Sequence, residues 1–293
     1  MRWIVVAALA AQLAAGGVAA DETAARKPSA AQIVAKNVAA RGGLEAWRKV
    51  QTLMWSGHME SATAQVPSMQ FVLQQKRPNM TRFELTALNR RTVRIFDGSR
   101  GWKLRPSAGG RMDAQPYTAQ ELKFAKEAQG IDGPLIDYEA KGIRVALDGV
   151  EDVEGHKAFR LNLQLPSGER HTVWIDASTF LESKYDRTSY SAAGVPGTVS
   201  VLYRDYMTVE GLKIPTVLII GAGSTKTPDK MVIEKIAVNP PLDDRAFTNA
   251  GALSARRARA PGPPRGWPAG APAPTAPSTT PDAANPDPGS AQR

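Results

Sequence analysis

The sequence contains no cysteine. This absence excludes disulfide bonds, thiolate metal ligands and a cysteine nucleophile. It also excludes the lipid-modified cysteine of a bacterial lipoprotein signal. We therefore expect a protein that is not anchored by lipid and does not depend on oxidation for its stability.

Histidine is scarce, because the 293 residues include only His58, His156 and His171. No two of them have the spacing of a metal-ligand pair on one helix or strand, and no G-x-S-x-G nucleophile elbow is present. A hydrolase triad of His171, Asp176 and a serine stays open as an alternative, although no spacing supports it. We expect a protein that is not an enzyme and that uses no metal and no cofactor.

Long apolar runs are lacking except at the N-terminus, where Arg2 precedes an almost wholly apolar stretch from Ile4 to about Ala15. Small residues lead to Ala20, and the charged pair Asp21-Glu22 follows. This order is typical of a secretory signal that is cleaved after Ala20. The run is shorter than the roughly 20 apolar residues of a membrane-spanning helix, so a membrane anchor is the less favoured alternative. We expect residues 1–20 to be a cleavable signal peptide, and the mature protein to be secreted across the inner membrane into the periplasm and to be soluble there.

Two regions of different composition follow the signal. Residues 21–252 have the composition of one globular domain of about 230 residues, without an internal linker or repeat. Residues 253–293 are rich in proline, alanine, glycine and serine, and we expect them to form a disordered tail. The first half of the tail is basic. We favour the hypothesis that the tail is a solvated linker. A polybasic contact of the tail with membrane or peptidoglycan is the alternative hypothesis.

The formal net charge of the whole chain is +9. The signal and the tail carry part of this surplus, and the remaining basic residues are dispersed along the domain. A nucleic-acid-binding surface would require basic residues clustered on one face with aromatic residues between them. We therefore expect no nucleic-acid partner.

Helices are predicted at three places in the domain. Ser29 and Gln32 form a capping-box pattern at the start of the first helix, which Gly42-Gly43 ends. A second helix is predicted from about Leu44 to Val50, and a third from about Thr118 to Gln129.

Most of the domain follows an apolar–polar alternation of period two, which is typical of antiparallel strands with one dry face. The predicted strands cover approximately residues 53–60, 69–76, 82–85, 93–95, 143–150, 158–165, 170–176, 181–188, 198–206, 214–220 and 230–238. A twisted sheet of this many strands must curl, and an incomplete barrel can enclose a ligand cavity. We therefore predict a mainly β (α+β) fold, an incomplete antiparallel β-barrel of about 11 strands with a few helices that plug or cover its opening.

The inward-facing apolar side chains of such a barrel would form the wall of the cavity. The candidates for this wall are Trp55, Met59, Met69, Phe71, Leu73, Phe83, Leu85, Ile95 and Trp102. The candidates for a lid are Phe124, Leu135 and Ile136. Alternation alone does not distinguish a cavity wall from an ordinary filled core, so a filled core stays open as the alternative.

Several short motifs occur in a fixed order along the domain. They are Arg41-Gly42-Gly43-Leu44-Glu45-Ala46-Trp47, Lys76-Arg77-Pro78-Asn79, Phe96-Asp97-Gly98 with Gly101-Trp102, Gly133-Pro134-Leu135-Ile136-Asp137-Tyr138, Val173-Trp174-Ile175-Asp176, and Asp205-Tyr206 followed by Gly211-Leu212-Lys213-Ile214-Pro215. From about Ser29 to Asn249 their order resembles the outer-membrane lipoprotein-sorting protein family, the LolA/LolB-like periplasmic lipoprotein carriers. The long proline- and alanine-rich tail departs from the pattern of that family.

The resemblance implies an incomplete β-barrel with helices packed against its opening and an apolar cavity that shields acyl chains without catalysis. LolB carries a lipidated cysteine, which this chain lacks, so the resemblance favours a soluble carrier. We also expect the protein to be a monomer. The implied partners are a lipoprotein or lipid cargo, and donor and acceptor proteins at the membranes are compatible with this role. The alternative hypothesis is a structural or interaction module of the cell envelope that uses the basic, proline-rich tail.

Overall fold

The structure is a computed structural model of the chain, and it describes residues 27–107, 111–128, 130–190, 195–222 and 227–248. The predicted signal peptide and the predicted tail lie outside the described residues. The chain divides into two units, Met1–Leu253 and Ser254–Arg293, and only the first contains described residues. None of the helices in these ranges has the length and apolar character that crossing a bilayer requires.

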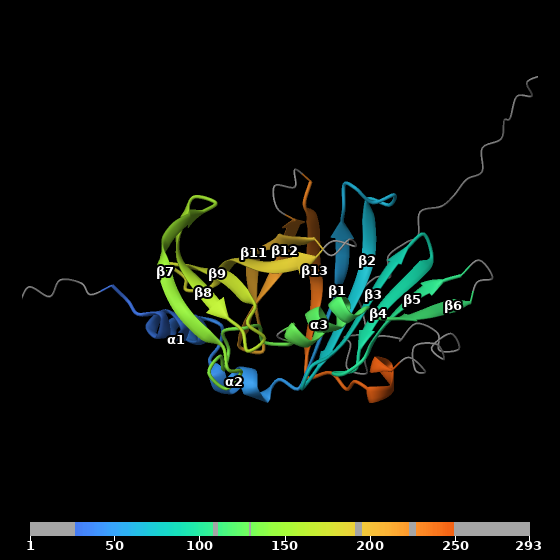
Figure 1. The fold of residues 1–293 in the computed structure, drawn as a ribbon, viewed down its shortest axis with the longest axis horizontal. Coiled ribbons are helices and arrows are strands. Elements are labelled where there is room, and N and C mark those ends of the chain that lie inside the picture. The colour runs from blue at the N-terminus through green and yellow to red at the C-terminus, as the bar shows by residue number, and fades with distance from the viewer. Residues whose placement is uncertain (1–26, 108–110, 129, 191–194, 223–226, 249–293) are drawn as a thin grey trace, which may run out of the picture. The chain divides into compact units, whose positions relative to one another are not determined.

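One antiparallel sheet of 13 strands makes up most of the described residues, in the order β6-β5-β4-β3-β2-β1-β13-β12-β11-β10-β9-β8-β7 (Figure 1). The strands are β1 (Thr52–Glu60), β2 (Ser68–Lys76), β3 (Met80–Ala87), β4 (Arg90–Phe96), β5 (Gly101–Pro106), β6 (Met112–Pro116), β7 (Arg144–Val153), β8 (His156–Gln164), β9 (Arg170–Asp176), β10 (Glu182–Tyr190), β11 (Pro196–Val209), β12 (Leu212–Ala222) and β13 (Asp229–Val238). The edge strands β6 and β7 do not pair with each other, so the sheet is not closed. The predicted incomplete antiparallel barrel is therefore confirmed.

The structure contains two strands more than the alternation predicted. These are β5 and β6, which form a hairpin at one edge of the sheet. Both are short, end in proline and carry several polar side chains, and β6 has no buried residue. An edge strand with this composition lacks the apolar repeat of a half-buried strand, which is why its sequence gave no signal.

The path of the chain explains where the third helix lies. The chain runs from β1 outward to β6, then from β7 at the other edge back to β13, which pairs with β1 (Leu53 opposite Val238). The connection between β6 and β7 therefore joins the two edges of the sheet. It carries α3 (Ala119–Glu127), which lies in front of the curved sheet in Figure 1.

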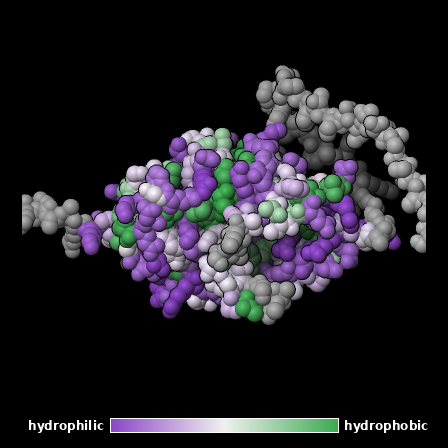
Figure 2. Space-filling model, turned by 90° about the horizontal axis from the view of Figure 1, so that it is seen from above, coloured by the Kyte–Doolittle hydropathy of each residue, from purple (hydrophilic) through white to green (hydrophobic). Residues whose placement is uncertain are grey.

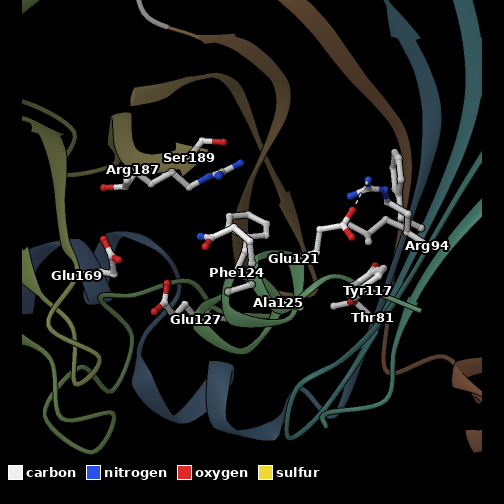
Figure 3. Close-up of a pocket in the computed structure, with 15 residues that line it drawn as sticks. Thr81, Arg94, Tyr117, Glu121, Phe124, Ala125, Glu127, Glu169, Arg187 and Ser189 are labelled. Carbon is white, nitrogen blue, oxygen red and sulfur yellow. Dashed lines mark hydrogen bonds and ion pairs between the residues drawn. The ribbon is translucent and has the colours of Figure 1, made fainter. Parts of the chain in front are cut away.

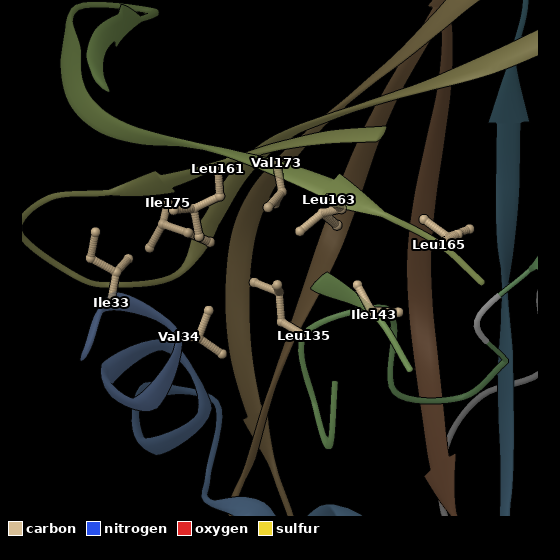
Figure 4. Close-up of a cluster of buried hydrophobic side chains, with 9 residues drawn as sticks. All are labelled: Ile33, Val34, Leu135, Ile143, Leu161, Leu163, Leu165, Val173 and Ile175. Atoms are coloured by element: carbon tan, nitrogen blue, oxygen red, sulfur yellow. The ribbon is translucent and has the colours of Figure 1, made fainter. Parts of the chain in front are cut away.

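The first helix packs against the sheet at β8 and β9. α1 (Ala30–Ala40) begins with the predicted capping box of Ser29 and Gln32. Its residues Ile33 and Val34 pack into a buried cluster (Figure 4) with Leu135, Ile143, Leu161, Leu163, Leu165, Val173 and Ile175. The sheet around β8 and β9 is thus covered by a filled core.

Two shorter elements cover other parts of the sheet. α2 (Leu44–Lys49) buries Trp47 against a cluster that includes Leu53, Ile136 and Ile214. The 3-10 helix η1 (Asp244–Phe247) buries Phe247 in a cluster with three residues of β4 and β5: Val93, Ile95 and Leu104.

Candidate functional site

A cavity of about 490 Å³ lies between α3 and the sheet (Figure 3). Its lining comes from β2, β3, β4, β10, α3 and the segments beside them: Leu73, Thr81, Phe83, Arg94, Tyr117, Gln120, Glu121, Phe124, Ala125, Glu127, Ala128, Glu169, Arg187, Thr188 and Ser189. Its volume is in the range of small-molecule sites. We call it the large cavity.

Register explains which strand residues reach the large cavity. Leu73 of β2 pairs with Phe83 of β3, and Phe83 pairs with Arg94 of β4. Paired residues of antiparallel strands point to the same face of a sheet. Two apolar side chains and one guanidinium therefore lie side by side on the face that α3 covers, which we call the inner face.

A capping box and two ion pairs position α3. The side chains of Thr118 and Glu121 form reciprocal bonds with each other's backbone N–H groups. Glu121 also accepts from Lys103 Nζ at 2.8 Å and forms an ion pair with Arg94 Nη2 at 3.3 Å. Burial acts to raise the pKa of Glu121, but the hydrogen bonds from Lys103 and Thr118 outweigh it and hold this pKa below its usual value. The carboxylate therefore stays charged and ties α3 to β4 and β5.

Arg187 enters the large cavity from the opposite side. In Figure 3 it extends from β10 toward Phe124, whereas Arg94 extends toward Glu121. The guanidinium carbon of Arg187 lies 4.4 Å from the centroid of the Phe124 ring. Burial lowers the pKa of Arg187, and Tyr185 and Tyr203 oppose that effect only partly.

A second, smaller cavity of about 250 Å³ adjoins the first. Its lining includes Trp55, which pairs with Leu73, and Tyr185, which stands two residues before Arg187 on the same strand. Leu73 and Arg187 both line the large cavity. The two cavities are therefore neighbours on the inner face.

Buried charges lie at the end of the small cavity that faces α2. Arg41 Nη1 donates to Glu182 Oε1 at 3.0 Å and to the Asp132 carbonyl at 2.9 Å. The carboxylate of Asp132 accepts from Arg77 Nη2 at 2.6 Å and from Lys141 Nζ at 2.7 Å. Burial lowers the pKa of Lys141 although Asp132 acts in the opposite direction. This network joins the segment before α2 to β10 and to the connection between α3 and β7.

The inner face beside the cavities is apolar and only partly covered. We call this surface the apolar inner face. Its cluster consists of buried Phe71, Met231 and Ile233, with Trp55, Met59, Leu73, Phe83, Leu85, Leu218, Ile220 and Ile236 partly buried around them. Seen from above, apolar side chains gather in the middle of the surface, with hydrophilic side chains around them (Figure 2). Near β1 the cluster therefore has more partly buried than fully buried members, whereas the cluster around β8 and β9 has nine fully buried residues, two of them from α1.

The predicted wall residues are distributed over three places. Trp55, Leu73 and Phe83 line the cavities. Met59, Phe71 and Leu85 belong to the apolar inner face, and half-buried Met69 pairs with Met59. Ile95 and Trp102 lie on the other face of the sheet, in the cluster around Phe247, because their neighbours Arg94 and Lys103 point inward.

The predicted lid residues also separate. Phe124 of α3 lines the large cavity and is 42% exposed. Leu135 and Ile136 have no exposed surface and belong to the core clusters beneath α1 and α2. Leu135 and Ile136 follow the third helix in an apolar loop, and this position in the sequence is typical of a lid. Their burial places them in the core.

The charged lining was not predicted from the sequence. Arg94 and Arg187 stand in alternating strands, where a polar residue is normally assigned to the solvent side. Arg94 could have been assigned to the cavity only from its pairing with Phe83. The periodicity of a single strand does not show which residues of two strands are paired.

His171 and Asp176 do not form a triad in the structure. His171 Nδ1 lies 2.5 Å from the hydroxyl of Tyr185. Asp176 accepts hydrogen bonds from Ser178 and Thr179 in the turn after β9. Each side chain has a local structural partner.

The fold and the cavities define a class of protein, an open antiparallel barrel with an apolar interior and a charged lining. The sequence matches no protein-family model and no curated protein sequence. Its fold is similar to that of a DUF1329 family protein from Desulfovibrio piger, with a TM-score of 0.50 and 13% identity over 76% of this chain and 98% of that chain. At this identity the match establishes a shared fold.

Two further solved structures carry the names of the group that the sequence motifs resemble. A LolA superfamily protein from Nitrosomonas europaea matches with a TM-score of 0.49 and 15% identity, over 76% of this chain and 99% of that chain. A domain from Vibrio parahaemolyticus, named for outer membrane lipoprotein sorting, matches with a TM-score of 0.49 and 15% identity, over 75% of this chain and 96% of that chain.

Proposed function

We propose that this protein is a non-catalytic periplasmic carrier that shields the acyl chains of a lipoprotein or another lipid inside the open barrel. The observation that carries the proposal is the apolar inner face, whose buried and partly buried side chains continue into the large cavity. The similarity to the lipoprotein-sorting domain and the sequence motifs support the same role. The predicted signal peptide supports the location.

Transfer energies explain why such a carrier needs no strong binding chemistry. Burying one methylene stabilises by about 0.8 kcal/mol, so an acyl chain of roughly 15 methylenes gains about 12 kcal/mol over exposure to water. Moving the chain from a bilayer to a comparably apolar cavity is nearly neutral. The direction of transfer then depends on the affinities of the donor and the acceptor.

The helix α3 has the properties of a movable cover. It contains no buried residue, and ion pairs of Glu121 with Arg94 and Lys103 attach it to the sheet. Segments with few buried contacts open at low free-energy cost. An acyl chain would enter when α3 moves away from Leu73 and Phe83.

Neighbouring residues on β2 provide a matched test of the proposal. Leu73 points to the large cavity, whereas Val72 points to the opposite face, and both are half-buried. We expect Leu73→Gln to weaken the binding of a fluorescent fatty acid at least several-fold, because a polar amide would line the cavity. Val72→Gln should leave the dissociation constant unchanged.

Fluorescence titration of the purified protein measures both constants, and thermal unfolding checks that both variants are folded. Equal effects of the two substitutions would contradict binding on the inner face.

A further inference from the structure

We propose that the cargo of the large cavity is a lipid with an anionic headgroup, a carboxylate or a phosphate, and that Arg187 binds this headgroup. The inference rests on the proposed carrier function and names the class of lipid that the cavity selects. A neutral acyl chain would need only the apolar inner face. The guanidinium of Arg187 at the border of the apolar inner face favours a lipid that carries a negative charge.

Arg187 differs from the other basic residues around the cavity in its partners. Arg94 and Lys103 form ion pairs with Glu121 at 3.3 Å and 2.8 Å. Lys123 forms an ion pair with Glu169 at 2.6 Å. Among the described residues, no carboxylate forms an ion pair with Arg187, whose guanidinium lies over the Phe124 ring.

The surroundings of Arg187 make an unpaired charge costly. The side chain is half-buried, and on the sheet it stands beside Val199 of β11. A charge that leaves water without a counter-charge costs free energy, which an anionic ligand restores. The planar guanidinium can donate two parallel hydrogen bonds to the oxygens of a carboxylate or a phosphate.

The position of Arg187 also fits an amphipathic ligand. Leu73 and Phe83 line the same cavity, and Phe83 stacks on Phe71 with the ring centroids 6.1 Å apart. A headgroup at Arg187 would therefore leave its acyl chain on the apolar inner face. Ser189, two residues further along β10, lines the same cavity and offers a hydroxyl donor.

The test compares charged and neutral ligands of equal chain length. After removal of bound lipid, the purified protein is titrated with a fluorescent fatty acid and with its methyl ester at pH 8. We expect the acid to bind at least about tenfold more tightly, which corresponds to about 1.4 kcal/mol. Displacement of the ester by a monoacylglycerol phosphate and by the matching monoacylglycerol then shows whether phosphate replaces carboxylate.

Substitutions assign the preference to Arg187. Arg187→Met should remove the preference for the acid and leave the affinity for the ester within about threefold, because methionine keeps the apolar stem. Arg187→Lys should restore part of the preference. Arg91→Met removes an arginine from the opposite face, where Arg91 pairs with Glu84, and should change neither affinity.

The outcomes separate the two proposals. Equal affinities of the wild type for acid and ester, or an equal loss of both in Arg187→Met, would overturn the role of Arg187 and leave the carrier function standing. Failure of the wild type to bind any acyl ligand would overturn both. Thermal unfolding of each variant shows whether a loss of binding reflects a loss of fold, and Arg187→Lys provides the second measurement if Arg187→Met does not fold.

Discussion

Arg41 connects three parts of the chain that are far apart in sequence. Its side chain donates to Glu182 and to the carbonyl of Asp132, and its own carbonyl accepts from Trp47 Nε1 at 3.0 Å. In the sequence, Arg41 begins the motif that ends at Trp47 and stands at the end of the first predicted helix. The partner at position 182 lies 141 residues away, and no local pattern identifies it.

Removing Arg41 should destabilise the protein strongly. The side chains of Arg41 and Glu182 are 9% and 10% exposed, so Arg41→Met leaves a buried carboxylate without its counter-charge. We expect the free energy of unfolding to fall by about 3–5 kcal/mol, as measured by urea denaturation.

Arg204→Met is the matched control, because the ion pair of Arg204 with Glu154 is 44% and 43% exposed. It should cost less than about 1 kcal/mol. Similar losses in the two variants would show that the buried pair has no special role.

Two histidines should contribute to stability with opposite dependence on pH. Burial lowers the pKa of His171 from 6.5, and Arg187 acts in the same direction. Because the unfolded chain then binds the proton more tightly, the stability of the protein decreases as the pH falls below 6.5. His171→Asn should remove this loss.

His58 is the internal comparison. Its hydrogen bond to Glu234 at 2.7 Å raises its pKa above 6.5, against the effect of burial. Its contribution is fully present below pH 6.5 and is lost as the pH rises through the raised pKa. Urea denaturation at several pH values between about 5 and 8 measures both slopes. Slopes of the same sign for the two histidines would contradict this assignment.

The periodicity of the sequence predicted most helices and strands, but it did not predict how neighbouring strands pair with each other. The capping box of α1 and eleven of the strands were evident because each is encoded by neighbours in sequence. Alternation shows which residues of one strand share a face, but the pairing of two strands decides whether their faces coincide. Because Phe83 pairs with Arg94, Arg94 lies on the face with the cavity, and its neighbour Ile95 lies on the other face of the sheet.

The contact between β1 and β13 depends on a glycine. The register between these strands shifts at Ser56/Gly57, and a Cβ on Gly57 would lie 2.0 Å from the carbonyl oxygen of Val232. We expect Gly57→Ala to lower the free energy of unfolding by about 1–3 kcal/mol, because the backbone atoms must move apart.

Gly197→Ala in β11 is the control, since no atom of the described residues lies within 4 Å of its added Cβ. Thermal unfolding compares the two variants. A Gly57→Ala protein as stable as Gly197→Ala would contradict the close approach.

At the scale of the whole fold, the two predicted alternatives, cavity wall and filled core, apply to different sides of one sheet. Around β8 and β9, α1 completes a core whose nine clustered residues are buried. Around β1 and β2, most of the clustered apolar residues are only partly buried. Partly buried apolar side chains of this kind are the feature on which the proposed carrier function depends. The sequence motifs indicated this fold, but only the packing shows which side of the sheet has the larger fully buried core.

The most direct test of the carrier function is native mass spectrometry of the full protein purified from its native membrane background under conditions that keep lipids bound. We expect a population whose added mass matches an acylated molecule, and a smaller fraction of that population in Leu73→Gln. A protein that is always found without lipid, and that also fails to bind a fluorescent fatty acid, would contradict it.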